Sequence, residues 1–299
     1  MKKFQRLFKK TYWWLPFFLY ASDANAWGLM THLYFAHSLL WAMPLLDPRL
    51  QKAIKRFPEL VMAGACLPDL AIVSRDFHAT HDWDYAHALL KNAKTEEDTA
   101  LAIGFASHLY IDVIAHHHFV PAHEGMWLNH AWLKAKHHTH SLVTHISSEW
   151  AMDAHLAPLM HTSPTKLLKN HHTTIITFIT THLQHSEATA VKAVKRLAFW
   201  DNVLRKTKIP HLIYHVAKMV DGNLHRNFIY YIAKTQTALA EIGLTFDGVK
   251  PLYEPELNHL SLQQKIHWRE MCLLHLHHTH PQPITYYQPS YQSSFSTSD

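Results

Sequence analysis

The chain has 299 residues, 48% of them hydrophobic, and a formal net charge of +5. This hydrophobic content is enough for a substantial core. Five Lys/Arg and one acid lie in residues 1–26, so the 273 residues that follow carry a net charge of only +1, which argues against a strongly polyanion-binding surface.

Residues 1–26 have the three parts of a secretory signal peptide. The basic start MKKFQRLFKK is followed by an apolar run of ten residues, YWWLPFFLYA, and Ala24-Asn25-Ala26 forms a small-x-small cleavage signal. The run is too short to span a bilayer as a helix, so we expect no integral membrane anchor. We therefore expect a secreted or periplasmic protein that starts at Trp27.

The spacing of apolar residues after the signal predicts an all-α fold. They recur at intervals of three and four, with little of the strict alternation that strands need. The expected helices are 31–43, 58–67, 83–92, 96–118, 127–161, 165–185, 187–206, 209–240 and 254–276. Prolines mark the breaks between them, at Pro44, Pro48, Pro68, Pro121, Pro164, Pro210 and Pro251.

We expect one multi-helix domain over residues 27–280. The segment 281–299 is rich in Pro, Ser, Gln and Tyr and has no apolar period, which predicts a disordered tail. In an exported protein, Cys66 and Cys272 can either form one disulfide or remain two buried thiols, and the sequence leaves both open. It gives no oligomeric state.

Histidines and acids at helical spacing are dense between residues 107 and 149. His108 precedes Asp112 by four residues and His145 precedes Glu149 by four, so each pair points to one side of a helix and can close on one ion. The chain has 30 histidines, however, so about two such pairs are expected by chance, and the pairs alone prove nothing. His118, ten residues after His108, lies about 80° round the helix on the other side from Asp112 and should face a neighbouring ion.

The order of candidate ligands along the chain resembles the zinc-dependent phospholipase C family and the related single-strand-specific nucleases of fungi and plants. The motifs that carry the resemblance are the signal that ends before a Trp, WGLMTH, GACLPD, THDWDY, SHLYID and HISSE. Their residues are Trp27, His32, Asp69, His81, His108, Asp112, His118, His145 and Glu149. In that family the free amino group and carbonyl oxygen of the Trp bind a zinc.

The resemblance implies three Zn²⁺ ions. Asp69, His81, His108 and Asp112 would hold the first. Trp27 and His32 would hold the second, with Asp112 as a bridge, and His118, His145 and Glu149 would hold the third. Asp69 would also orient or deprotonate the attacking water. Imidazole and carboxylate ligands suit zinc.

Some of these assignments have competitors. His78 competes with His81, although the spacing of twelve residues from Asp69 favours His81. His116 and His117 compete with His118, and the proline that the family usually has before this histidine is absent. Other histidines that compete with His145 lack an acid four residues later; they are His137, His138 and His140.

The resemblance implies a secreted phospholipase C that cleaves the glycerol–phosphate ester of phospholipids at a membrane surface. The GAxxPD motif and the modest charge favour a lipid substrate. The five-residue step from Trp27 to His32 favours a single-strand nuclease, with nucleic acid as its substrate. A third hypothesis, suggested by the number of histidines, is an exported zinc-binding protein without catalysis.

Overall fold

The computed structural model describes residues 28–42, 44, 46–123, 142–249 and the single positions 263, 264 and 267. These residues form helices joined by short turns, and no strand occurs among them. The expected all-α fold is confirmed. The predicted signal peptide, Trp27, Cys272 and the tail 281–299 lie outside the described residues.

The first half of the chain supplies the central helices. They are α3 (Leu29–Ala42), α4 (Pro48–Arg56), α5 (Pro58–Gly64), α6 (Leu70–Val73), η3 (Arg75–His81), α7 (Trp83–Asn92), α8 (Glu96–Ile114) and the π-helical turn η4 (Ala115–Phe119). The second half supplies α11 (Leu142–Leu156), η5 (Ala157–Leu159), α12 (Pro164–Asn170), α13 (His172–His182), α14 (Glu187–Thr207), α15 (Ile209–Val220), α16 (Leu224–Ala238), η6 (Leu239–Glu241) and α17 (Ile242–Phe246).

Helix α8 is the core of the protein. Every residue from Thr99 to Ile114 is buried, because α3, α4, α5, α7 and α17 all pack against it. Thr95 accepts a hydrogen bond from the Asp98 amide at 3.0 Å and so caps the start of the helix. The continuous helical stretch Glu96–His123 is long and apolar enough to cross a membrane. Its most apolar segment is entirely buried inside the protein, however, as in the core helix of a globular domain.

The backbones of α5 and α8 touch where two glycines face the opposite helix. A Cβ atom at Gly64 would lie 2.2 Å from the Leu101 carbonyl oxygen, and one at Gly104 would lie 2.0 Å from the Val61 carbonyl oxygen. Only a residue without a side chain allows so close a crossing. This crossing brings the turn after α5 against the part of α8 that carries His108.

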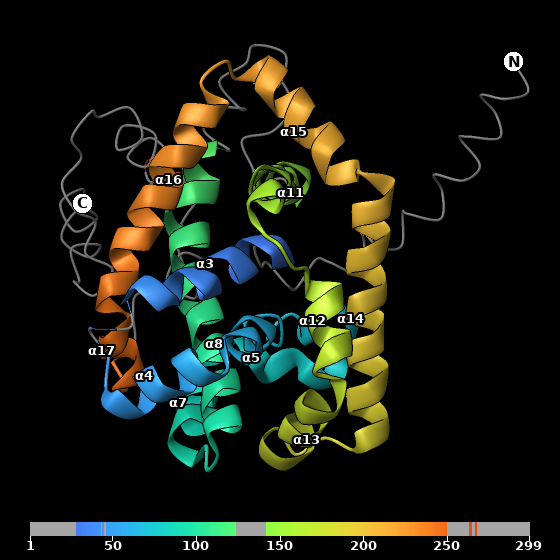
Figure 1. Ribbon diagram of the computed structural model, residues 1–299. Coiled ribbons are helices and arrows are strands. Elements are labelled where there is room, and N and C mark those ends of the chain that lie inside the picture. Colours follow the sequence, from blue (N-terminus) through green and yellow to red (C-terminus); the bar gives the residue numbers. More distant parts are fainter. Residues whose placement is uncertain are drawn as a thin grey trace, which may run out of the picture.

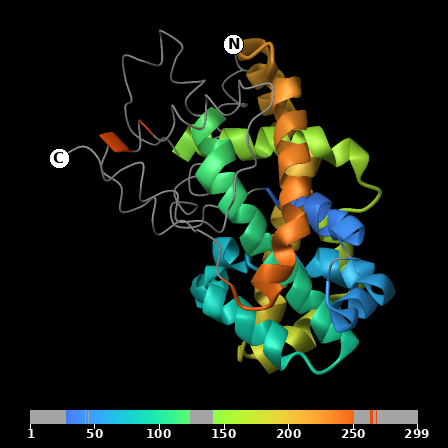
Figure 2. The ribbon, with the colours of Figure 1, turned by 90° about the vertical axis from the view of Figure 1, so that its left-hand side faces the viewer.

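The second half of the chain wraps around this core. Helices α14, α15 and α16 form three sides of a frame around α11 and α3 (Figure 1), and α11 packs against both α15 and α3. In the view turned by 90°, α16 runs down the side of the described part that faces the viewer, at a large angle to α3, which it contacts (Figure 2).

Several predicted helices differ from the observed ones in their ends. The predicted 209–240 divides at Gly222 into α15 and α16, and the predicted 165–185 divides at His171 into α12 and α13. Pro48 was expected to be a break, but it is the first residue of α4, where Asp47 caps the helix by accepting a hydrogen bond from the Arg49 amide at 2.8 Å.

Candidate metal centre

Three helices and two turns bring the predicted ligands to one region of the interior. His32 lies on α3, Asp69 directly precedes α6, and His81 ends η3. His108 and Asp112 lie on α8, and His145 and Glu149 lie one turn apart on α11. Among the described residues, three groups each offer one ligand atom per residue with these atoms within 4.8 Å of one another, and together they are called the cluster: His32 with His108 and Asp112, Asp69 with His81 and His108, and His116 with His145 and Glu149.

Asp112 is the centre of the cluster. Its carboxylate lies 3.2 Å from Nε2 of His32, 3.2 Å from Nε2 of His108 and 3.6 Å from Nε2 of His81. His32 and His108 stack, with ring centroids 3.6 Å apart. One carboxylate therefore joins two of the three groups, which is the position of a ligand shared by two ions.

His108 is oriented by the backbone. Its Nδ1 lies 2.8 Å from the carbonyl oxygen of Ala65, in the turn that follows α5. Because a carbonyl oxygen can only accept, Nδ1 carries the proton and donates it, which leaves Nε2 facing Asp112 and Asp69. The Nε2 atom lies 3.7 Å from Oδ1 of Asp69.

The structure brings His81, and not His78, to Asp69. His78 is exposed, and its Nδ1 contacts the carbonyl oxygen of Arg75 at 3.2 Å, outside the cluster. The spacing of twelve residues from Asp69 had favoured His81.

The third group contains His116 where the sequence favoured His118. Nε2 of His145 lies 2.9 Å from Oε1 of Glu149, and the rings of His116 and His145 stack at 5.0 Å. The cause lies in the π-helical turn, which places one more residue in a turn and rotates everything after it relative to a regular α-helix. His118 is buried outside the three groups, and its carbonyl oxygen accepts a hydrogen bond from the Tyr231 hydroxyl at 3.2 Å.

The polar atoms of the cluster lack ordinary hydrogen-bond partners. Nε2 of His32, His81 and His108 and both carboxylate oxygens of Asp69 and Asp112 are buried without a hydrogen bond of normal geometry among the described residues. Buried polar groups are nearly always paired. Short nitrogen–oxygen distances without hydrogen-bond geometry fit atoms that face a common ion, and the histidine and carboxylate set fits zinc.

Burial sets the charges of these groups. It lowers the pKa of His32 and of His81 to about 4, so both imidazoles are neutral, as metal ligands must be. It raises the pKa of Asp69 to about 8. Burial also disfavours a charge on His108, but the carboxylates of Asp112 and Asp69 outweigh it and raise the pKa to about 9. For Asp112 the burial cost is outweighed by His108 and His32, which hold its pKa well below the usual value. A cation would take the place of the His108 proton.

Asp153, which the sequence did not single out, connects two ligand-bearing helices. Its carboxylate accepts hydrogen bonds from the Thr31 amide at 2.8 Å, the Thr31 hydroxyl at 2.6 Å and the Met30 amide at 3.3 Å. It thus caps the start of α3 from α11, one turn beyond Glu149. Asp153 follows Glu149 by four residues and so lies on the same side of α11, and this spacing could have identified it from the sequence.

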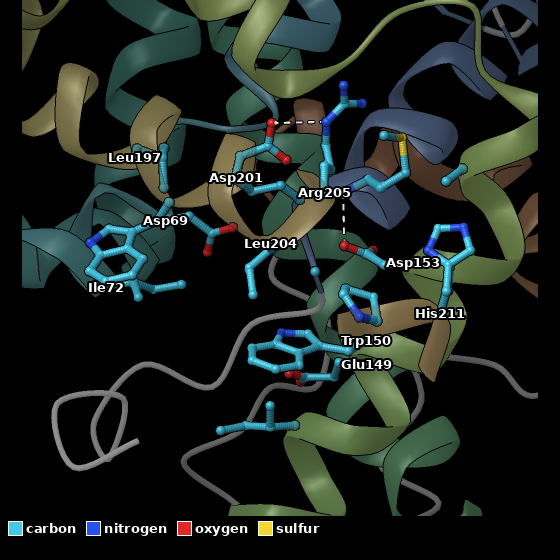
Figure 3. A pocket seen from close by; sticks show the side chains of 18 of the residues that line it. Asp69, Ile72, Glu149, Trp150, Asp153, Leu197, Asp201, Leu204, Arg205 and His211 are labelled. Carbon is cyan, nitrogen blue, oxygen red and sulfur yellow. Dashed lines mark hydrogen bonds and ion pairs between the residues drawn. The ribbon is translucent and has the colours of Figure 1, made fainter. Parts of the chain in front are cut away.

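A mostly apolar cavity of about 120 Å³ opens beside the cluster (Figure 3). Asp69 and Glu149 form part of its wall, with Trp150 next to Glu149. The remaining wall comes chiefly from α6, α11, α14 and α15, through Ile72, Val73, Ile146, Ala154, Leu197, Trp200, Leu204, Pro210 and His211. At one edge, Nε of Arg205 lies 3.7 Å from Oδ2 of Asp201.

Cys66 is buried and forms no disulfide within the described part of the chain, which does not include Cys272, and its Sγ lies 3.6 Å from the carbonyl oxygen of Met62. Burial and the nearby Asp69 carboxylate raise the pKa of this thiol well above its usual value. The structure therefore places it as a packed core residue.

Comparisons with known proteins agree with the geometry. Residues 31–199 match the protein family described as zinc dependent phospholipase C, and this range contains the whole described cluster. Neither curated proteins nor solved structures gave a significant match. Since the family match covers more than half of the chain, the chain belongs to the zinc-dependent phospholipase C family.

Proposed function

We propose that the protein is an exported phospholipase C that hydrolyses the glycerol–phosphate ester of phospholipids at a site of three Zn²⁺ ions. Asp69, His81, His108 and Asp112 hold one ion. His32 and the amino-terminal Trp27 hold a second, with Asp112 shared. His116, His145 and Glu149 hold the third. The three groups of side chains within ligand distance support this arrangement.

Zinc bound at these residues supplies Lewis acidity toward the phosphoryl oxygens and lowers the pKa of a water molecule. The protein's own groups orient the reaction. The hydrogen bond from His108 to Ala65 fixes the tautomer that presents Nε2 to the centre. The carboxylate of Asp69 lies at the boundary between the cluster and the cavity, where it can accept the proton of the attacking water.

The apolar cavity is the observation that favours a lipid substrate. A phosphodiester bound between Asp69 and Glu149 would have its ester oxygen beside a wall of Trp150, Leu197 and Leu204. Apolar side chains favour the glycerol and the first methylenes of an acyl chain. A single-strand nuclease would instead need a basic groove with exposed stacking platforms.

Three substrates separate the hypotheses when tested with the zinc-loaded mature protein. We expect phosphatidylcholine to be cut to diacylglycerol, glycerophosphocholine, which lacks acyl chains, to be cut poorly, and single-stranded DNA to remain intact. Cleavage of DNA alone would establish the nuclease instead. Equal rates on phosphatidylcholine and glycerophosphocholine would show that the cavity does not favour substrates with acyl chains.

Metal counting separates the enzyme from a zinc-storage protein. A trinuclear enzyme retains about three zinc ions through dialysis, because its ligands are preorganised by packing. A storage protein would bind many ions loosely. Fewer than two tightly held ions would contradict the trinuclear proposal.

A further inference from the structure

Helix α15 carries an apolar stripe on its solvent side. Leu212, Val216 and Met219 are 65%, 42% and 79% exposed. At about 100° per residue the three side chains fall within about 60° of one another around the helix axis. Pro210 and Ala217, the buried residues of α15, lie about 150° away. The helix therefore packs on the protein through one face and presents a second apolar face to solvent.

Basic side chains accompany this stripe. Between Asp201 and Asp221 the sequence contains four Lys/Arg and no acid: Arg205, Lys206, Lys208 and Lys218. All four are exposed, and of these only Arg205 has an ion pair among the described residues. His211, His215 and Lys218 are exposed along one flank of the stripe.

The stripe adjoins the cavity beside the candidate metal centre. Pro210 and His211, at the start of α15, line that cavity, as do Leu204 and Arg205 at the end of α14. Figure 1 shows α15 at the outer edge of the described part of the protein, above α11, which carries Glu149. One helix thus forms both a wall of the cavity and an exposed apolar surface.

We propose that α15 is the surface by which the protein docks on a phospholipid bilayer. Leu212, Val216 and Met219 insert among the acyl chains at the interface, and the lysines contact the lipid phosphates. An apolar face with basic flanks is the pattern of helices that lie in the interface plane. This inference rests on the proposed function, because it supplies the route by which a lipid in a membrane reaches the cavity.

A second copy of the chain fits the stripe less well. A two-fold contact would bring the same lysines of both copies together without an intervening acid, and like charges at an interface are unfavourable. Three side chains also fall far short of the 20–30 residues, or about 800 Å² per partner, that a stable protein interface uses.

The test compares wild type with the triple variant Leu212→Gln/Val216→Gln/Met219→Gln. The matched control is Leu244→Gln, on α17, where Leu244 is also 46% exposed. Each protein is measured for cosedimentation with vesicles of pure phosphatidylcholine and with vesicles that also contain phosphatidylglycerol. It is also measured for hydrolysis of the same vesicles and of dihexanoyl-phosphatidylcholine below its critical micelle concentration.

We expect the triple variant to lose roughly tenfold or more in vesicle binding and vesicle hydrolysis, since three apolar side chains no longer enter the interface. Its hydrolysis of the monomeric lipid, its thermal unfolding and the Leu244→Gln control should stay close to wild type. Lys218→Glu should weaken binding to the phosphatidylglycerol vesicles more than to pure phosphatidylcholine.

Vesicle binding by the triple variant equal to that of wild type would overturn the proposal. So would a concentration-dependent wild-type dimer that the triple variant abolishes, because a second copy would then occupy the stripe. Absence of hydrolysis of the monomeric lipid by wild type would instead refute the proposed function, and cosedimentation would still decide whether α15 docks on lipid.

Discussion

Nε2 of His116 lies 3.7 Å from Oδ1 of Asp112, one turn earlier in the chain. The same His116 ring stacks on His145. Asp112 therefore contacts the group on α11 through His116 as well as the groups built from α3, η3 and α8. The carboxylate that joins two of the groups thus also contacts a member of the third, so changes to Asp112 and to His116 give the sharpest tests.

His116→Ala should remove one zinc of three, whereas His118→Ala should retain all three. His116 lies within ligand distance of His145 and Glu149, and His118 lies outside that group. Zinc counted by atomic absorption after dialysis distinguishes the two variants. Loss of one zinc in His118→Ala, with three kept in His116→Ala, would show that His118 is the ligand, as the sequence favoured.

Asp112→Asn should bind fewer than two zincs tightly and lose activity. The amide keeps the shape of the side chain but removes the charge that two ions would share in the proposed site. In the metal-free protein the variant leaves His108 without its closest anion, at 3.2 Å. Breaking a buried ion pair costs about 3–5 kcal/mol. We expect lower stability in urea with chelator present, and unchanged zinc content would contradict the shared ligand.

How much of this centre could be predicted depends on the kind of information each residue carries. His108 and Asp112 follow from helical periodicity, and the spacing from Asp69 pointed to His81. The sequence could not identify His116 rather than His118 as the residue in the third group. A regular helix was expected there, and nothing in the sequence AHHHF indicates a π-helical turn. The cavity was also missed, since it is made by side chains from four helices that come together only in the fold.

Among the helices, the ones set by local signals were predicted best. The predicted 83–92 coincides with α7, and the predicted helix start at Glu96 is confirmed. Helix α4 was missed because Pro48 was interpreted as a break, although proline is common at the first position of a helix. The extents proposed for the domain and the tail stay predictions.

Gly104→Ala should destabilise the protein and weaken zinc binding together. The added Cβ would lie 2.0 Å from a backbone oxygen of α5, so α5 and α8 must separate. Overpacking of this kind costs about 1–3 kcal/mol or more. Separation also moves Ala65 away from His108 and loosens the ring that faces the ions.

Gly222→Ala is the matched control, because nothing lies within 4 Å of a Cβ atom at that turn. Its urea midpoint and zinc content should remain at the wild-type values. Equal effects of the two alanines would contradict the close crossing of α5 and α8.

Asp153→Asn should change the pH dependence of stability in the metal-free protein. Burial raises the pKa of Asp153 to about 7, although hydrogen bonds from Thr31 and Met30 act in the opposite direction. Since the folded pKa exceeds the unfolded value of about 3.9, the folded state binds this proton more tightly. Its stabilising effect is full below about pH 4 and is lost as the pH rises to about 7.

Asparagine does not titrate and keeps one oxygen that can accept from α3. Wild type should therefore lose stability relative to Asp153→Asn between pH 4 and 7, by at most about 1.4 kcal/mol per pH unit. Asp153→Ala, which removes the acceptor as well, should be destabilised at both ends of the range. Urea unfolding at pH 5 and pH 8 measures the difference, and parallel curves for wild type and Asp153→Asn would refute it.

Blocking cleavage before Trp27 should produce a precursor that lacks one zinc. Gly28 accepts hydrogen bonds from the Thr31 and His32 amides at 2.9 and 3.4 Å and so begins α3, one turn from His32. An amino group at residue 27 would be released at this end of α3, whereas an uncleaved chain has an amide nitrogen there, whose lone pair is delocalised into the peptide bond. We expect the precursor with Ala26→Pro to bind about two zincs and to be nearly inactive. Full activity with three zincs in the precursor would show that the amino group is not a ligand and that His32 and Asp112 hold their ion without it.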